Sequence, residues 1–292
     1  MFIIRKCIME KLIVNNKYDN KKLNTFILDS FPELSLNMLN KALRQKDVKI
    51  NGVRIRENVT IHENDEILLY IADEFLFRKV DFNIVYEDNN VLIVNKPCGI
   101  EVISDTSKNC LTYLLKEKYA FVEPCHRLDR NTTGLVLFAK NKITLDILLK
   151  KFKNKEIKKY YKCLVYGIPK KNSDILIGYL FKDSKKSRVY ISDIPKTGYK
   201  KIITSYKVLD TDIVNNTSTL EVLLEYSGRT HQIRAHLAHM GFPIIGDGKY
   251  GKNEINKKFN KKTQELMSYK LVFSFTTDSG ILNYLNGKKF EI

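Results

Sequence analysis

Residues 126–140 read HRLDRNTTGLVLFAK, a polar loop followed directly by an apolar run with the composition of a buried β-strand. A loop at the end of such a strand presents its side chains from a rigid support. Arg127 and Arg130 flank Asp129, and opposite charges nearby favour the ionised carboxylate. An ionised, oriented carboxylate can act as a nucleophile. The same pattern suits an aspartate that caps a turn and pairs with arginine, and this stretch alone favours that structural role.

A second polar stretch, residues 228–241, reads GRTHQIRAHLAHMG and has the spacing of a helix that ends at its last glycine. We expect His231 and Arg234 on one side of this helix, where they offer hydrogen-bond donors. Arg229 lies just before the helix, within reach of a substrate phosphate or an aspartate. The opposite, apolar face is expected to consist of Ile233, Leu237 and Met240.

Three histidines of this stretch raise the alternative of a metal site. His231, His236 and His239 lack the His-Glu-x-x-His spacing of a helical zinc site. In addition, His236 is expected near the apolar side, away from the other two. We therefore expect no metal, and a metal-dependent hydrolase that uses His231 and His239 is the weakest alternative.

A lysine-rich segment spans residues 150–162 and contains seven lysines opposed only by Glu156. Tyr160 and Tyr161 lie among these lysines. Lysines interleaved with aromatic rings suit a nucleic-acid groove, with charge for the phosphates and rings for unstacked bases. A solvated helix end is the alternative, and on this segment alone it is the better interpretation.

The charge balance also points to an anionic partner. Fifty Lys and Arg face 33 Asp and Glu, a formal net charge of +17, which is typical of nucleic-acid binding. The abundance of Lys, Asn and Ile offers an alternative source for the charge, an AT-rich coding sequence. Arginine argues for function, because seven of the ten arginines are clustered. The clustered arginines are Arg127, Arg130, Arg229, Arg234, Arg44, Arg54 and Arg56.

Cysteine usage and hydropathy indicate a cytoplasmic protein. The five cysteines are odd in number and form no Cys-x-x-Cys pair, which argues against a disulfide framework and a thiolate metal site. No apolar stretch approaches the length of a membrane span, and the apolar run at the start is too short for a signal peptide. The sequence leaves open whether translation starts at Met1 or Met9.

The N-terminal part predicts two helices, a hairpin and a strand. A first amphipathic helix runs from Leu23 to near Pro32, and Ser35 is placed to cap a second one that runs to Arg44. Asn51-Gly52 predicts a two-residue hairpin turn, and a strand is expected at residues 66–71. Residues 10–75 resemble the small αL-type RNA-binding module named after ribosomal small-subunit protein S-four. An ordinary N-terminal packing subdomain is the alternative.

Residues 73–82 have no clear period and are expected to form a linker, followed by a catalytic domain at residues 80–292. Its strands and helices do not alternate as they would around a parallel sheet, so we expect an α+β domain with a mixed or antiparallel sheet. The expected strands lie at residues 82–86, 91–95 and 220–226, and the expected helices at residues 111–118, 143–152 and 230–240.

Taken together and in order, these motifs resemble the RluA-type pseudouridine synthases, which modify single uridines in structured RNA. The matching segments are residues 91–99 (VLIVNKPCG), 126–140, 159–167 (KYYKCLVYG), 228–234 and 243–251 (PIIGDGKYG). Two segments depart from the family pattern, because the His-Pro pairs expected after Gly99 and within residues 273–277 are absent. The departures touch none of the residues that carry the expected activity.

The resemblance implies site residues and partners. Asp129 would be the catalytic carboxylate, Tyr161 the ring that packs on the target base and a candidate for taking the C5 proton, and Arg229 the partner that holds Asp129. Arg127 would fill the gap left by the extruded nucleotide. Other expected RNA contacts are Arg130, His231, Arg234, Lys159, Arg44 and Arg54. The expected substrate is RNA of the 23S ribosomal type, with no cofactor, metal or membrane partner and a monomeric chain.

The chemistry of Asp129 stays open at this point. It could attack C6 of uracil, form an adduct at the anomeric carbon of ribose, or remove a ribose proton. A non-catalytic RNA-binding or ribosome-assembly factor that keeps this fold is the main alternative to an enzyme.

Overall fold

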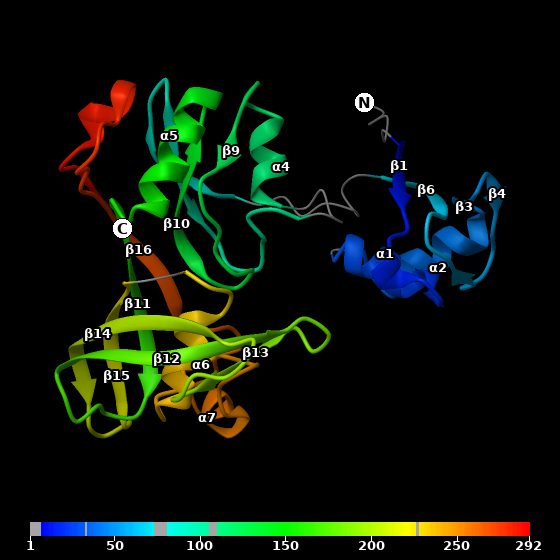
Figure 1. Ribbon diagram of the computed structural model, residues 1–292. Helices are drawn as coiled ribbons and strands as arrows, with labels where there is room; N and C mark the ends of the chain where they lie inside the picture. Colours follow the sequence, from blue (N-terminus) through cyan, green and yellow to red (C-terminus); the bar gives the residue numbers. More distant parts are fainter. Residues whose placement is uncertain (1–6, 33, 73–80, 105–109, 226–227) are drawn as a thin grey trace, which may run out of the picture. The chain divides into compact units, whose positions relative to one another are not determined.

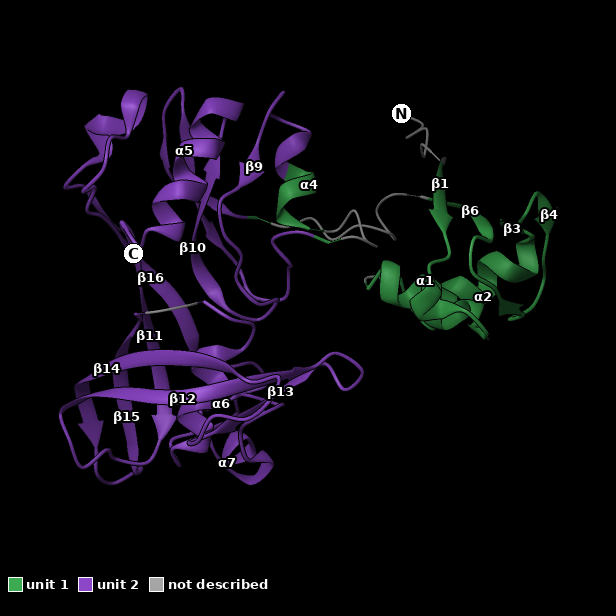
Figure 2. Cartoon of the chain, viewed as in Figure 1, with its two compact units in different colours: residues 1–81, 104–114 green, residues 82–103, 115–292 purple. Residues whose placement is uncertain are grey.

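The computed structural model describes residues 7–292 apart from residues 33, 73–80, 105–109 and 226–227 (Figure 1). The chain forms two compact units: residues 1–81 with 104–114, and residues 82–103 with 115–292 (Figure 2). Most of the expected linker therefore lies outside the described residues.

The described part of the first unit contains a four-stranded sheet with the order β1-β6-β3-β4, two α-helices and a short 3-10 helix. Its strands are β1 (Cys7–Ile13), β3 (Val48–Ile50), β4 (Val53–Arg54) and β6 (Glu66–Ala72), with a separate short pair, β2 (Lys21–Lys22) and β5 (Thr60–Ile61). Its helices are η1 (Asn16–Tyr18), α1 (Leu23–Ser30) and α2 (Leu36–Gln45). One apolar core holds these elements together.

Local chemistry explains the expected elements of this unit. The Ser35 hydroxyl accepts a hydrogen bond from the Met38 backbone N–H, as in an N-cap. Asn51 and Gly52 both have positive φ, the conformation of a tight hairpin turn between β3 and β4. The two helices, the hairpin and the strand at residues 66–71 are therefore confirmed.

Strand β1 was not expected, and its side chains explain why. It pairs antiparallel with β6, yet Met9 and Ile13 are each 51% exposed while Glu10 is buried. This pattern is the reverse of the usual alternation, in which apolar side chains face the core. A prediction based on the spacing of hydrophobic residues therefore misses the strand.

The second unit is built on an eleven-stranded sheet with the path β13-β12-β14-β15-β11-β16-β10-β8-β7, to which β17 and β9 attach. Only the β10–β16 pair is parallel among its described pairs. The expected α+β class with a mixed sheet is confirmed. The strands are β7 (Asn83–Glu87), β8 (Val91–Lys96), β9 (Glu123–Pro124), β10 (Thr133–Ala139), β11 (Ile157–Tyr166), β12 (Ser173–Asp183), β13 (Arg188–Ser192), β14 (Lys200–Asp212), β15 (Thr217–Leu224), β16 (Leu266–Phe273) and β17 (Lys289–Glu291).

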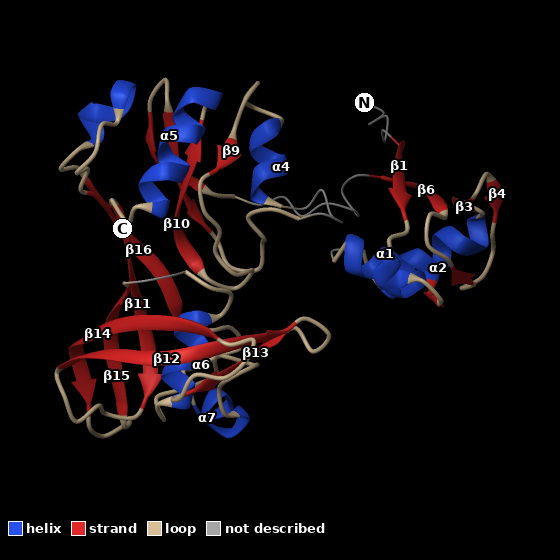
Figure 3. Ribbon diagram, viewed as in Figure 1, coloured by secondary structure: helices blue, strands red, loops and turns tan. Residues whose placement is uncertain are grey.

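Helices pack against both ends of this long sheet (Figure 3). Helix α5 (Lys142–Lys153) packs against β10 and β11, and α6 (Gln232–His239) packs against β12, β13 and β14. The remaining described helices are α4 (Leu111–Lys116), α7 (Asn253–Lys258) and η2 (Gly280–Leu285). The expected helices at residues 111–118, 143–152 and 230–240 thus correspond to α4, α5 and α6.

Gly134 explains how two strands meet beside the polar loop of residues 126–132. Its φ is +107°, and a Cβ atom there would lie 2.2 Å from the Ser268 carbonyl oxygen of β16. Only glycine fits so close a backbone approach at a positive φ. The loop before β10 is thereby fixed next to the middle of the sheet.

Candidate active site

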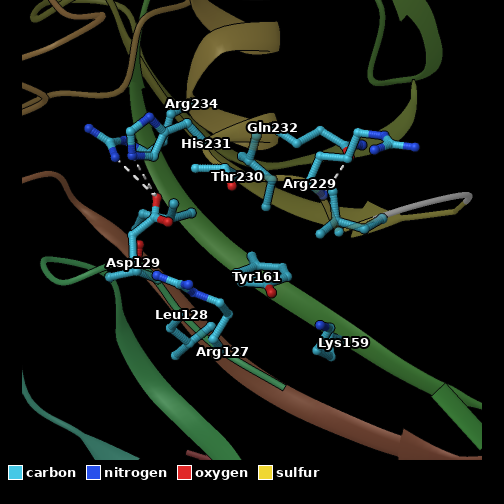
Figure 4. Close-up of a pocket in the computed structure, with 15 residues that line it drawn as sticks. Arg127, Leu128, Asp129, Lys159, Tyr161, Arg229, Thr230, His231, Gln232 and Arg234 are labelled. Carbon is cyan, nitrogen blue, oxygen red and sulfur yellow. Dashed lines mark hydrogen bonds and ion pairs between the residues drawn. The ribbon is translucent and has the colours of Figure 1, made fainter. Parts of the chain in front are cut away.

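A pocket opens where the loop before β10, strand β11 and the N-terminus of α6 converge (Figure 4). The empty space within it is about 570 Å³ when the open solvent at its mouth is included. Its lining includes Arg127, Asp129, Lys159, Tyr161, Arg229, His231 and Arg234. All seven come from the residues expected at the site, so the fold gathers motifs that lie about a hundred residues apart.

Asp129 presents one oxygen to the pocket and has the other held. Its side chain is 22% exposed, and Oδ2 accepts a hydrogen bond of 3.0 Å from Nη1 of Arg234. Nε2 of His231 lies 3.8 Å from the same oxygen. Among the described residues, Oδ1 has no hydrogen-bond partner. The carboxylate is therefore oriented while one oxygen stays open.

The backbone around Asp129 is held from behind by a buried lysine. The Lys96 ammonium is fully buried and donates to the carbonyl oxygens of Pro97, Ile100 and Arg130 at 2.8–3.0 Å. Burial lowers the pKa of Lys96 to about 8, against the opposing effect of nearby acidic groups that include Asp129. These three bonds fix the loop that carries the carboxylate.

Arg234 is itself fixed by a second carboxylate. Asp247 is fully buried and accepts two hydrogen bonds from Arg234, Nε to Oδ2 at 2.7 Å and Nη2 to Oδ1 at 2.9 Å. This bidentate geometry locks the plane of the guanidinium. The remaining nitrogen, Nη1, then points at Asp129.

The expected partner of Asp129 was wrong: the arginine that holds it is Arg234, not Arg229. Figure 4 shows the Arg229 side chain directed away from Asp129, on the other side of the pocket. The reason is the backbone at His231, whose φ of +54° turns the chain sharply between the two arginines. Linear spacing carries no information about such a turn.

Tyr161 lies on β11 in the floor of the pocket and is 5% exposed. Burial, with a smaller contribution from the negative charge of Asp129, raises the pKa of its phenol. The hydroxyl is therefore protonated at neutral pH in the free protein. A tyrosine takes up a proton only as its phenolate, and this burial disfavours that form.

Comparison with known proteins identifies the family. Residues 90–239 match the family model of the RNA pseudouridylate synthases. The chain is 33% identical to an uncharacterised RNA pseudouridine synthase of Mycoplasma capricolum over 96% of both chains. It is 34% identical to the ribosomal large subunit pseudouridine synthase C of Rickettsia typhi, over 80% of this chain and 83% of the relative.

The chain belongs to the RluA-type RNA pseudouridine synthases. It is therefore an isomerase that acts on RNA. Its fold is similar to human RNA pseudouridylate synthase domain containing 1, with a TM-score of 0.56 and 25% identity over 68% of this chain and 80% of the human one.

Lys159 lies on β11 at the edge of the synthase pocket. Its ammonium is 5.3 Å from the centroid of the Phe152 ring. Burial lowers the pKa of Lys159 to about 8. This side chain is thus a cation whose charge changes near neutral pH.

Two further arginines expected to bind RNA lie on either side of Asp129 in the loop before β10. Arg127 is exposed and lines the pocket. Arg130 is also exposed, and its Nε donates to the Gly99 carbonyl at 3.0 Å, so it helps to hold the loop. In the N-terminal unit Arg44 and Arg54 are exposed, and Arg54 donates to the Lys46 carbonyl.

Helix α6 departs from the expected two-faced pattern. Arg234 is only 8% exposed and His236 only 1%, whereas Met240, placed on the apolar face, is 41% exposed. The helix is enclosed by the sheet on one side and by the loop of Asp247 on the other, so that polar side chains are buried against specific partners. Hydrophobic period alone cannot anticipate partners of this kind.

The three histidines of this region have separate partners. Nδ1 of His236 lies 3.0 Å from the Thr204 hydroxyl, and Nε2 of His239 lies 2.9 Å from Asp193. Within the described ranges, no group of three or more His, Cys, Asp or Glu side chains could hold a metal ion. Nor does any described helix have the length and apolar character needed to cross a membrane.

Two residues that organise the site were missed as functional in the sequence. Asp247 lies in the segment of residues 243–251 that carries the family resemblance, and Lys96 lies in the segment of residues 91–99. Each is a charged residue beside apolar neighbours and a glycine or proline, and a charged side chain in apolar surroundings is buried only when it is paired. That signal existed in the sequence, although it does not name the partner.

Proposed function

We propose that this synthase converts specific uridines of large-subunit ribosomal RNA to pseudouridine, with Asp129 as the nucleophile. The observation that carries the proposal is the asymmetry of Asp129, with Oδ2 held by Arg234 and Oδ1 open to the pocket. The choice of RNA is supported by the relatives in Rickettsia species, which are named ribosomal large subunit pseudouridine synthase C.

The reaction breaks the bond between N1 of uracil and C1′ of ribose and forms a bond between C5 and C1′. C5 loses a proton and N1 gains one, so atoms and electrons balance without an oxidant, a reductant or a group donor. Asp129 can add through Oδ1 to C6 of the base or to C1′ of the ribose, and leaves again when the carbon–carbon bond has formed. Arg234 holds the carboxylate in place throughout.

The rest of the pocket suits an extruded nucleotide. A stacked base must leave the helix before chemistry can occur, and packing against an aromatic ring offsets part of the cost. The Tyr161 ring in the pocket floor provides that surface, and exposed Arg127 can occupy the space vacated in the RNA. Residues 10–75, with exposed Arg44 and Arg54, are proposed to bind the surrounding RNA.

Asp129→Asn and Asp129→Ala test the nucleophile. Each variant should lose turnover by at least about 10³-fold, because a group that forms a covalent intermediate is removed. RNA affinity should stay within about threefold, since Asp129 makes no favourable contact with phosphate. The measurement is pseudouridine mapping after incubation with ribosomal RNA and, separately, with transfer RNA.

Asp146→Asn on the exposed face of α5 is the matched control and should be fully active. Pseudouridine formation in both Asp129 variants at the wild-type rate would disprove the nucleophile. Modification of transfer RNA alone would disprove the proposed substrate while leaving the nucleophile intact.

A further inference from the structure

Tyr250 lies between the hairpin of β12 and β13 and the wall of the active-site pocket. Its hydroxyl oxygen is 2.9 Å from the backbone nitrogen of Val189 at the start of β13 and 2.9 Å from Nδ1 of His231. The Tyr250 and His231 rings pack edge to face, with centroids 5.5 Å apart. The contact between the two side chains is therefore both a hydrogen bond and a packed pair.

The direction of these hydrogen bonds follows from the groups involved. The backbone N–H of Val189 can only donate, so the Tyr250 oxygen accepts from it. The phenol has one proton to give, and among the described residues its only other partner is Nδ1 of His231. Nδ1 is then an acceptor, and a neutral imidazole that accepts at Nδ1 carries its hydrogen on Nε2.

His231 is neutral under working conditions. Burial lowers its pKa to about 4, although the negative charges of Asp129 and Asp247 act in the opposite direction and the positive charges of Arg234 and Lys249 reinforce it. The pKa of Tyr250 is raised, mainly by burial, so its hydroxyl keeps its proton at neutral pH. The bond between the two rings thus joins two uncharged groups.

The protonated nitrogen of His231 faces the pocket. Nε2 lies 3.8 Å from Oδ2 of Asp129, too far for a hydrogen bond, and Arg234 already occupies that oxygen. Figure 4 shows the His231 ring beside Arg234 at the Asp129 end of the pocket. A neutral N–H donor therefore lies next to the carboxylate without being used by it.

We propose that Tyr250 is a positioning residue, which fixes His231 in the Nε2–H form so that this donor binds an oxygen of the target nucleotide beside Asp129. The chemical class of the acceptor is a uracil carbonyl or a ribose oxygen. A neutral donor suits this position, because it can bind either oxygen without forming an ion pair with the neighbouring carboxylate. The inference rests on the proposed function, since it assumes that Asp129 meets the target nucleotide here.

The same short loop supports both groups that face Asp129. The backbone N–H of Tyr250 donates to Oδ1 of Asp247 at 3.0 Å, and Asp247 holds Arg234. The Arg234 guanidinium also lies over the Tyr250 ring, 5.3 Å from its centroid. These contacts fix Tyr250 relative to Arg234. The positions of the two donors that face Asp129, Arg234 and His231, are therefore linked through Tyr250.

The first test reads the tautomer directly. In protein labelled with ¹⁵N-histidine, the His231 signals should show a protonated Nε2 and an unprotonated Nδ1, with no titration above about pH 5. Tyr250→Phe keeps the ring and removes the proton donor, so the His231 signals should change to a mixture of both tautomers. Tyr206→Phe, which removes a hydroxyl bonded only to the Lys171 carbonyl among the described residues, is the control and should leave them unchanged.

An Nδ1–H form in the wild-type protein, or an unchanged His231 spectrum in Tyr250→Phe, would overturn the proposal. This measurement needs no turnover. A failure of the tautomer assignment is therefore distinct from a failure of Asp129 as nucleophile.

The second test separates positioning from structural support. Tyr250→Phe should lower kcat about tenfold with little change in RNA affinity, as expected for one misdirected hydrogen bond. His231→Gln keeps a neutral N–H donor and should retain more activity than His231→Ala. In the His231→Ala background, Tyr250→Phe should have no further effect on kcat, and an equal tenfold loss in that background would contradict the proposal.

Discussion

The ion-pair network around Arg234 and the one around Lys151 both lie in the second unit, and they differ in their access to solvent. In the first, Arg234 joins buried Asp247 to Asp129, which is 22% exposed. In the second, Lys151 pairs with Glu156 at 2.7 Å, and their side chains are only 2% and 4% exposed. The first network thus opens into a pocket, whereas the second is closed.

The donors around each carboxylate show what this difference means. Both oxygens of Glu156 are occupied, by Lys151, by the Thr277 hydroxyl and by the backbone N–H groups of Thr276 and Thr277. Asp129 has donors on Oδ2 alone among the described residues. A carboxylate with all its positions filled holds the chain together, and one with a free oxygen can react.

Among variants of the basic residue of each network, the largest effect is expected when Arg234 is removed. Arg234→Gln should lower kcat by about 10²–10³-fold, the range seen when one preorganised charged donor is removed. It should also destabilise the fold by about 3–5 kcal/mol, because Asp247 is left as an unpaired buried charge. The measurements are single-turnover kinetics and urea unfolding.

Two variants separate the effects on activity and stability. Arg234→Gln combined with Asp247→Asn removes the stranded charge, so stability should recover while turnover does not. Arg229→Gln is the matched control and should keep Asp129 in place, with most of kcat retained. A larger loss of kcat in Arg229→Gln than in Arg234→Gln would show that catalysis does not depend on the Arg234–Asp129 pair of the structure.

A smaller effect, on stability alone, is expected from the closed network. Lys151→Met leaves Glu156 buried and unpaired, which should lower the free energy of unfolding by about 3–5 kcal/mol. Turnover of the folded fraction should not change, since neither residue lines the pocket. Adding Glu156→Gln should recover part of the loss, whereas Lys150→Met on the exposed helix surface should change stability by less than about 0.5 kcal/mol.

The closed network also has a characteristic pH dependence. Burial tends to raise the pKa of Glu156, but hydrogen bonds from Lys151, Thr277 and Thr276 outweigh it and lower the pKa to about 2. A lowered carboxyl pKa contributes stability above the unfolded value of 4.5, which is lost as pH falls toward 2. In Lys151→Met this acid sensitivity should diminish, and an unchanged profile would mean that other carboxyl groups dominate.

These two networks also mark what the sequence could and could not predict. The run before Lys140 is apolar enough to predict β10. The order of the motifs predicted that Asp129 and Tyr161 share one site, and both line the same pocket. Arg234 rather than Arg229 pairs with Asp129 because the backbone at His231 is left-handed, and no local sequence pattern predicts that conformation.

The lysine-rich segment of residues 150–162 shows a second limit. Nothing in the sequence distinguishes one lysine of this segment from another, and we expected all of them on the surface. Lys151 is instead buried, and its ammonium donates to the carbonyl and hydroxyl oxygens of Thr277. Thr277 lies 126 residues further along the chain, so the local sequence gives no sign of this partner. Residues 273–277 also lack the family His-Pro pair, and here they serve to close this network.

The smallest effect concerns Lys159, the member of the same lysine-rich segment that does reach the pocket. Because burial lowers its pKa to about 8, Lys159 is charged below that pH and neutral above it. If it contacts RNA phosphate, KM should rise about twofold to fivefold between pH 7 and pH 9, the range of one partly exposed ion pair. Lys159→Arg stays protonated over this range, so its KM should be flat with pH. An equal rise in KM for the arginine variant would assign the pH dependence to another group and leave Lys159 outside the RNA contact.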